Sequence, residues 1–276
     1  MATGVNAETR PKRPATRTWG WLLALFLSLN AALGLNLFSG PHSQVPVKPV
    51  AAGEEAAQVE PPPQRYASVL KYDRLPPGVR LSRTNILNTL VQRYGYSSYL
   101  EIGQGLSQAN FDWVRCRTKV GVDPDKSLNA AYPMTSDEFF ALNKATFDLI
   151  FIDGLHQADQ VERDILNALQ VLNENGSILV HDCNPTSREM QVIPRAQKIW
   201  TGDVWKAWVR LRATRPDLKM YVIKAESGCG LIRRGRQTTI ELPDNLTYEG
   251  LAETREKWLN LVEPNTFLED LKRGPS

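Results

Sequence analysis

Two acidic residues stand where apolar stretches of the chain end. Asp153 follows residues 147–152, and Asp182 follows residues 177–181. If both stretches are parallel strands, their carboxyl ends meet at the edge where open α/β sheets bind their ligands. Two carboxylates at that edge could hold a hard divalent cation of the Mg²⁺ type.

Histidines lie beside both acids. The chain contains three histidines, of which His156 follows Asp153 by three residues and His181 directly precedes Asp182. An imidazole changes its charge near neutral pH and can take a proton from a reacting group. His156, Asp153 and Asp182 are therefore the candidate catalytic residues, whereas His181 is more simply explained as a buried strand residue.

A glycine-bearing turn follows an earlier apolar stretch of the chain. Residues 99–102 lead into Gly103, Gly105 and Ser107, where small residues would let the backbone approach a ligand closely and a following helix would add donors. About twenty residues further on stands Asp123, at the end of a second apolar stretch, where an acid can accept hydrogen bonds from two ribose hydroxyls. The turn therefore predicts a nucleotide-type cofactor.

Two features of this turn argue against a dinucleotide. Gln108 stands where GxGxxG would have its third glycine, and Glu101 would repel a pyrophosphate. An acid is better suited to the cationic methionine end of S-adenosylmethionine. An NAD(P)-dependent oxidoreductase or epimerase stays open as the alternative, although no Tyr-x-x-x-Lys pair lies near the predicted site.

The elements that must hold these residues form an α/β pattern. Strands are predicted at residues 99–102, 119–122, 147–152 and 177–181, and most of them are continuously apolar, as in parallel strands covered on both faces. Helices are predicted at residues 82–94, 157–172 and 199–212, the second closed by a turn at Asn175-Gly176, and a hairpin at residues 220–223 and 230–232. We expect a Rossmann-like, doubly wound and mostly parallel sheet with a C-terminal antiparallel hairpin.

These motifs together resemble a known family. The segments are Glu101-Ile102-Gly103-x-Gly105-x-Ser107, Val122-Asp123, Thr135-Ser136-Asp137-Glu138-Phe139-Phe140 and the stretch from Phe147 to His156. They look like the class I S-adenosylmethionine-dependent methyltransferases, in the branch related to catechol and macrolide-sugar O-methyltransferases. The resemblance covers roughly residues 82–234.

The resemblance implies roles for individual residues. Glu101, Gly103, Gly105 and Ser107 would bind S-adenosylmethionine at its methionine part, Asp123 its ribose, and Ser136 with Asp137 its adenine edge. The last two could equally cap a helix. Asp153 and Asp182 would hold a metal such as Mg²⁺, with His156 as the base. The family often has a third metal ligand, an Asn or an acid, beside the second Asp, whereas this chain has Cys183 there. The acceptor would be a hydroxyl of a glycan or small molecule, under a loop at residues 184–187.

The N-terminal region has the composition of a membrane anchor. Residues 19–38 carry no charge and are about 20 residues long, enough to cross a bilayer as one helix. Four basic residues precede this segment, so the positive-inside rule predicts a cytoplasmic N-terminus (type II orientation). We expect a basic tail (1–18), a transmembrane helix (19–38), a Pro/Ala-rich stalk (39–65), the methyltransferase domain (66–240) and a charged tail (241–276).

Composition restricts the other function classes. The net charge is +3 and much of the excess lies near the N-terminus, so nucleic acid is not an expected partner. Three cysteines without CxxC spacing encode neither a disulfide framework nor a zinc cluster. A non-catalytic, membrane-anchored module with the same fold is a third possibility beside the two enzymes.

Overall fold

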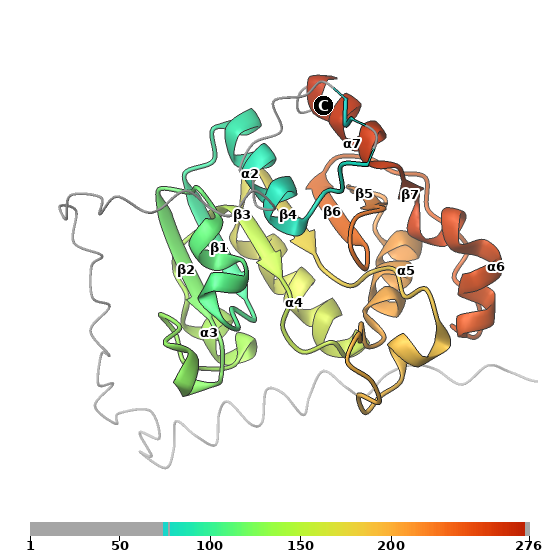
Figure 1. The fold of residues 1–276 in the computed structure, drawn as a ribbon, viewed down its shortest axis with the longest axis horizontal. Coiled ribbons are helices and arrows are strands. Elements are labelled where there is room, and N and C mark those ends of the chain that lie inside the picture. The colour runs from blue at the N-terminus through green and yellow to red at the C-terminus, as the bar shows by residue number, and fades with distance from the viewer. Residues whose placement is uncertain (1–73, 77, 274–276) are drawn as a thin grey trace, which may run out of the picture. The chain divides into compact units, whose positions relative to one another are not determined.

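The computed structural model of the protein describes residues 74–76 and 78–273, which fall within the unit Glu60–Ser276 (Figure 1). The predicted basic tail, transmembrane helix and stalk, residues 1–65, lie outside the described residues. Among the helices that are described, each is too short or too polar to span a bilayer.

The described residues form a mixed sheet with the order β2-β1-β3-β4-β6-β5-β7. The strands are β1 (Ser98–Ile102), β2 (Thr118–Val122), β3 (Phe147–Ile152), β4 (Leu172–Val180), β5 (Leu218–Ile223), β6 (Cys229–Arg234) and β7 (Leu261–Val262). β1 to β4 pair in parallel, whereas β6 pairs antiparallel with both β4 and β5. The predicted parallel sheet and its C-terminal hairpin are confirmed.

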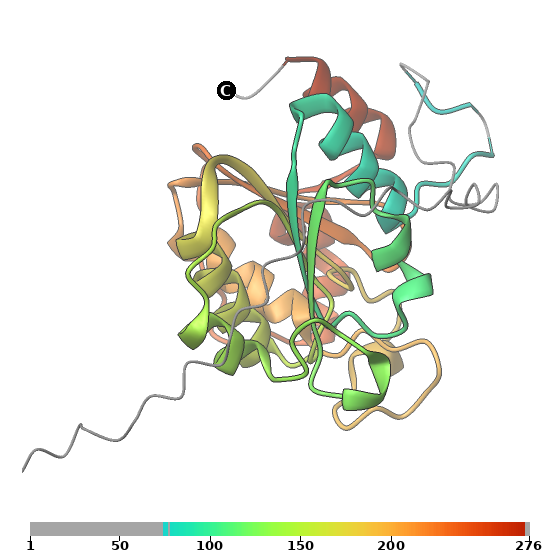
Figure 2. The same ribbon diagram turned by 90° about the vertical axis from the view of Figure 1, so that its left-hand side faces the viewer.

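Helices cover both faces of this sheet (Figures 1 and 2). They are α2 (Arg83–Tyr94), α3 (Ser136–Leu142), α4 (Ala158–Val171), α5 (Val204–Thr214), α6 (Tyr248–Leu259) and α7 (Pro264–Arg273). α2 and α7 pack on one face, and α4, α5 and α6 pack on the other. The sheet is therefore buried on both sides, which explains its continuously apolar strands.

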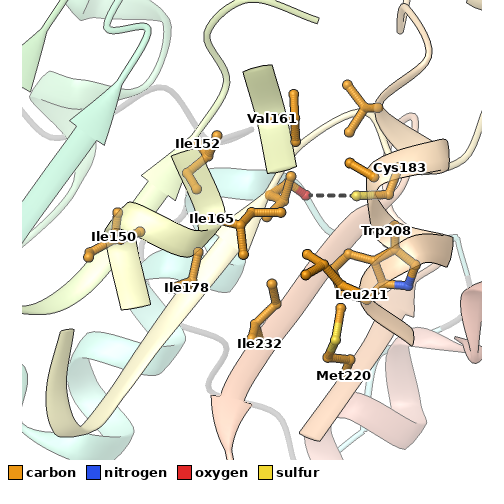
Figure 3. Packing of buried hydrophobic residues seen from close by; sticks show 14 of the residues in the cluster. Ile150, Ile152, Val161, Ile165, Ile178, Cys183, Trp208, Leu211, Met220 and Ile232 are labelled. Carbon is orange, nitrogen blue, oxygen red and sulfur yellow. Dashed lines mark hydrogen bonds between the residues drawn. The ribbon is translucent and has the colours of Figure 1, made fainter. Parts of the chain in front are cut away.

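Alternation along each strand divides the core into two clusters. In β3, Leu149 and Phe151 belong to the cluster under α2, while Ile150 and Ile152 belong to the cluster under α4 and α5. Successive side chains of a strand point to opposite faces, so a continuous apolar run fills both clusters. Figure 3 shows the second cluster, where Trp208 of α5 packs over β6 and β5.

Two predicted boundaries were wrong. The Asn175-Gly176 turn lies inside β4, in a shift of register against β3. Asn173 donates a 2.7 Å hydrogen bond to Asp148 Oδ1, which holds the extra residues within the strand. The helix predicted at residues 199–212 begins at Val204 instead, directly after Asp203, whose backbone amide donates to the His156 carbonyl at 3.2 Å.

The segment predicted to be a charged tail is part of the fold. β7 pairs in parallel with β5, and α6 and α7 bury Trp258 and Phe267 in the two core clusters. The polar residues that dominated the composition of this segment lie on the outer sides of its two helices. The domain boundary predicted at residue 240 is therefore wrong.

Candidate active site

The predicted cofactor turn joins the end of β1 to the neighbouring strands. The Gly103 amide donates to the Val122 carbonyl at 2.9 Å, and the Gly105 amide donates to Asp123 Oδ2 at the same distance. Gly103 has φ +79°, and a Cβ built on it would lie 2.4 Å from the Asp153 carbonyl oxygen. The turn thus lies directly against the end of β3, where Asp153 stands.

Glu101 lies beneath this turn in a buried polar network. Tyr99 donates a 2.6 Å hydrogen bond to the Glu101 carboxylate, and Asn110 donates to it at 3.2 Å. Thr84 of α2 in turn donates to Asn110 at 2.8 Å. Burial outweighs these donors and raises the pKa of Glu101 to about 7.

The turn does not lead into an α-helix, and that expectation was wrong. Two short 3₁₀ helices, Ser107–Ala109 and Phe111–Trp113, follow it instead. Asn110 stands between them with φ −152° and ψ −53°, because its side chain is turned inward to Glu101. Donors for a ligand at this position must come from the turn and not from a helix terminus.

The remaining cofactor candidates line the same region in part. Asp123 is buried at the end of β2, and Ser107 borders a cavity of about 400 Å³ between the turn and residues 127–131. Thr135 is the N-cap of α3, so Ser136 and Asp137 are its first two helical residues and do not cap it themselves. Both accept hydrogen bonds from Gln160 of α4 at 3.2 Å.

The structure brings the predicted catalytic residues together. His156 Nε2 lies 3.3 Å from Asp153 Oδ1, and His156 Nδ1 lies 3.3 Å from Asp182 Oδ2. His181 Nδ1 is 3.2 Å from Asp153 Oδ1 and 3.4 Å from Asp182 Oδ1. His181 is therefore a member of this cluster and not merely a buried strand residue.

Two further members of the cluster were missed from the sequence. Arg83 Nη1 lies 3.3 Å from Asp153 Oδ2, and Glu226 Oε2 lies 2.7 Å from His181 Nε2. Arg83 is the first residue of α2, which precedes β1, and Glu226 is in the hairpin between β5 and β6. A helix that precedes a parallel strand begins at the carboxyl edge of the sheet, and such a topological argument could have found Arg83.

Mutual charge stabilises the ionised forms of the cluster. Burial opposes ionisation of Asp153, but His181, His156 and Arg83 outweigh it and hold the pKa of Asp153 well below its usual value. Burial likewise opposes charge on His181, yet Asp153 and the neighbouring acids raise its pKa well above the usual value. The pKa of His156 is raised as well, because Asp153 and Asp182 outweigh its burial.

The loop that follows Asp182 covers one side of His156. Asp182 itself has φ +60°, a left-handed conformation that a residue other than glycine adopts at a cost. Trp200 stacks on the His156 ring with centroids 5.1 Å apart, whereas Trp205 and Trp208 are buried in the core. Of these three tryptophans, Trp200 is the one beside the cluster.

The cluster contains donor atoms of the kind that bind a divalent cation. Ligand atoms of Asp153, His181 and Asp182 lie within 4.8 Å of one another, so an oxygen- and nitrogen-donor set exists. However, Arg83 Nη1 lies 3.3 and 3.4 Å from the two ring nitrogens of His181 and 3.3 Å from Asp153. A cation bound by these atoms would lie against a guanidinium that is always charged, so the residues present do not fit a metal.

Part of the chain is similar to a known protein family. The sequence model of a family described as methyltransferase domain matches residues 59–183. No curated protein matches the chain.

Three solved structures illustrate the similarity. An SAH-bound methyltransferase of Podospora anserina is 17% identical over 56% of this chain and 80% of its own, with a TM-score of 0.40. The O-methyltransferase of Bacillus cereus in complex with SAH is 19% identical over 58% of this chain and 84% of its own, with a TM-score of 0.41. The O-methyltransferase TomG of Streptomyces achromogenes is 16% identical over 54% of this chain and 78% of its own, with a TM-score of 0.41.

The matched segment contains the glycine-bearing turn, Asp123, both strand-end acids and the parallel strands β1 to β4. Residues 59–183 are therefore similar to a methyltransferase domain.

Proposed function

We propose that this protein transfers the methyl group of S-adenosylmethionine to a hydroxyl group of a sugar, glycan or small molecule. The contact between the Gly103 turn and the end of β3 carries the proposal, since it would place a methyl donor beside Asp153 and His156. Glu101, beneath the same turn, would face the cationic end of the cofactor.

His156 is the base in this proposal. Its Nε2 lies 3.3 Å from Asp153, while its buried Nδ1 makes no hydrogen bond within the described residues and lies 3.3 Å from Asp182 Oδ2. If Nε2 donates to Asp153, Nδ1 is the atom that accepts the proton of the acceptor hydroxyl. The carbon–sulfur bond of the cofactor breaks as the carbon–oxygen bond forms, which leaves neutral S-adenosylhomocysteine and a protonated His156.

Calorimetry with the purified full chain tests the cofactor. We expect S-adenosylmethionine to bind and NAD to show no heat above dilution. Binding of NAD alone would favour the oxidoreductase alternative, and binding of neither would favour a non-catalytic module.

Methyl transfer is then measured with labelled S-adenosylmethionine and a panel of hydroxylated sugars, glycans and phenols. For an acceptor found in this way, His156→Asn should lower kcat by about 10²–10⁴-fold, the usual contribution of a general base. Cofactor affinity of the variant should stay near that of the wild type. An unchanged kcat would remove His156 from the mechanism.

We further propose that residues 19–38 anchor the protein in a membrane with its N-terminus in the cytoplasm. Support comes from the uncharged segment and the basic residues that precede it. Alkaline carbonate extraction of cells expressing the full chain should leave it in the membrane fraction, whereas residues 60–276 alone should be released. Release of the full chain would contradict the anchor, and protease accessibility of an N-terminal tag reports the orientation.

A further inference from the structure

A permanent cation already occupies the cluster of acids. The guanidinium of Arg83 lies 3.3 Å from Asp153 Oδ2 and 3.8 Å from Glu226 Oε2. Its Nη1 is also 3.3 Å from His181 Nδ1. Arginine stays protonated even where burial opposes its charge, so this positive charge does not depend on pH.

Arg83 is held in this position by its own backbone. It is the first residue of α2, directly after the Ser82 capping box, in which Ser82 and Asn85 bond to each other's backbone amides. Its amide donates to Glu226 Oε1 at 3.3 Å. The residue is therefore tied to the cluster through both its main chain and its side chain.

The charges of the cluster leave no place for a second cation. Asp153 has Arg83 at Oδ2 and both His156 and His181 at Oδ1, so each of its oxygens already faces a positive or donor group. Asp182 in turn lies 3.3 Å from His156 and 3.4 Å from His181. A divalent ion would have to displace these partners and approach Arg83 in a largely buried site, where charges of like sign repel strongly.

We propose that Arg83 takes the place of a divalent cation in this methyltransferase. On the basis of the proposed function, Arg83 is a positioning residue: it neutralises Asp153 and Glu226, and thereby fixes the acid that orients His156. Methyl transfer would then proceed without a metal, and removal of Arg83 would turn the same acids into a metal site.

Metal binding can be measured without knowing the acceptor. The full chain is titrated with Mn²⁺ and the free ion is followed by electron paramagnetic resonance, for the wild type, Arg83→Met and Arg83→Lys. The wild type and Arg83→Lys should bind Mn²⁺ only weakly. Arg83→Met should bind it at least about tenfold more tightly, since loss of the cation leaves buried acids uncompensated. Adding Asp153→Asn to Arg83→Met should abolish the gain.

Each result decides the proposal. Tight Mn²⁺ binding by the wild type would overturn it, as would a folded Arg83→Met that gains no Mn²⁺ affinity. Circular dichroism and S-adenosylmethionine calorimetry establish that Arg83→Met is folded. If it is not, the thermal melt of the wild type decides, because addition of Mg²⁺ or EDTA should leave that melting temperature unchanged and a rise with Mg²⁺ would contradict the proposal. Failure of cofactor binding in the wild type would contradict the proposed function instead.

Discussion

Glu101 combines a buried carboxyl group with a position beneath the cofactor turn. Its folded-state pKa of about 7 exceeds its ordinary value of 4.5, chiefly because burial disfavours the charged form. Between those values the folded protein binds more protons than the unfolded chain. The free energy of unfolding that Glu101 contributes is therefore complete below pH 4.5 and is lost as the pH rises through 7.

Replacing Glu101 by Gln should remove this pH dependence, because the amide has no charge to desolvate. Relative to the wild type, Glu101→Gln should gain about 2.5 kcal/mol of unfolding free energy between pH 5 and pH 8. Urea denaturation of both proteins at the two pH values measures the gain. The exposed Glu269→Gln serves as the control, and parallel pH profiles for Glu101→Gln and the wild type would contradict the prediction.

The two glycines of the turn should respond differently to substitution. Gly103→Ala would force a Cβ within 2.4 Å of the Asp153 carbonyl oxygen at φ +79°, whereas Gly105 has φ +56° and open space around it. We expect a loss of more than about 2 kcal/mol for Gly103→Ala and about 1 kcal/mol for Gly105→Ala. Denaturant titration gives both values, and calorimetry should detect weaker S-adenosylmethionine binding by Gly103→Ala. Equal losses would show that the close approach has no energetic weight.

At the scale of elements, the fold follows from strands that are apolar on both faces and helices with one apolar side. α5 illustrates the packing: Trp208 lies over β6 at Gly230, where no side chain intervenes. A Cβ on Gly230 would lie 2.3 Å from the Trp208 ring. Only the smallest residue allows α5 to pack this closely on the sheet.

Gly230→Ala should therefore destabilise the protein by about 1–3 kcal/mol through overpacking. Trp208→Leu should be destabilising by itself, but in the double variant it frees the space that the new methyl group needs. The losses of unfolding free energy in Gly230→Ala and Trp208→Leu should therefore add up to more than the loss in the double variant, by about 0.5–3 kcal/mol. Urea denaturation of the four proteins measures this difference, and simple additivity would exclude the contact.

At the scale of the whole molecule, the C-terminal segment completes both core clusters. β7 extends the sheet beside β5, while α6 and α7 close opposite faces (Figures 1 and 2). Arg255 of α6 also donates to the Pro185 carbonyl at 2.6 Å, in the loop that follows Asp182. The segment thus supports the fold and the loop beside the active site.

Phe267 provides a test of this role, since it is fully buried in α7. Phe267→Ala should lower the free energy of unfolding by about 3–5 kcal/mol. On the exposed side of the same helix, Glu269→Ala should change it by no more than about 0.5 kcal/mol. Both values come from urea denaturation, and a loss below 1 kcal/mol for Phe267→Ala would mean that α7 is not required by the core.

Local patterns by themselves determined the parallel strands β1 to β4, the β5–β6 hairpin, α2, α4 and the strand-end acids, because apolar periodicity and turn residues act over short stretches of chain. Asp153, His156 and Asp182 could be placed together since parallel strands end at one edge. Only the tertiary structure decided that α6 and α7 belong to the core, because their few apolar residues need distant partners to be recognised. The tertiary structure also brings Arg83 and Glu226 to the acids, although they lie 70 and 73 residues from Asp153 in the sequence. Charge compensation acts through space, and local spacing does not encode it.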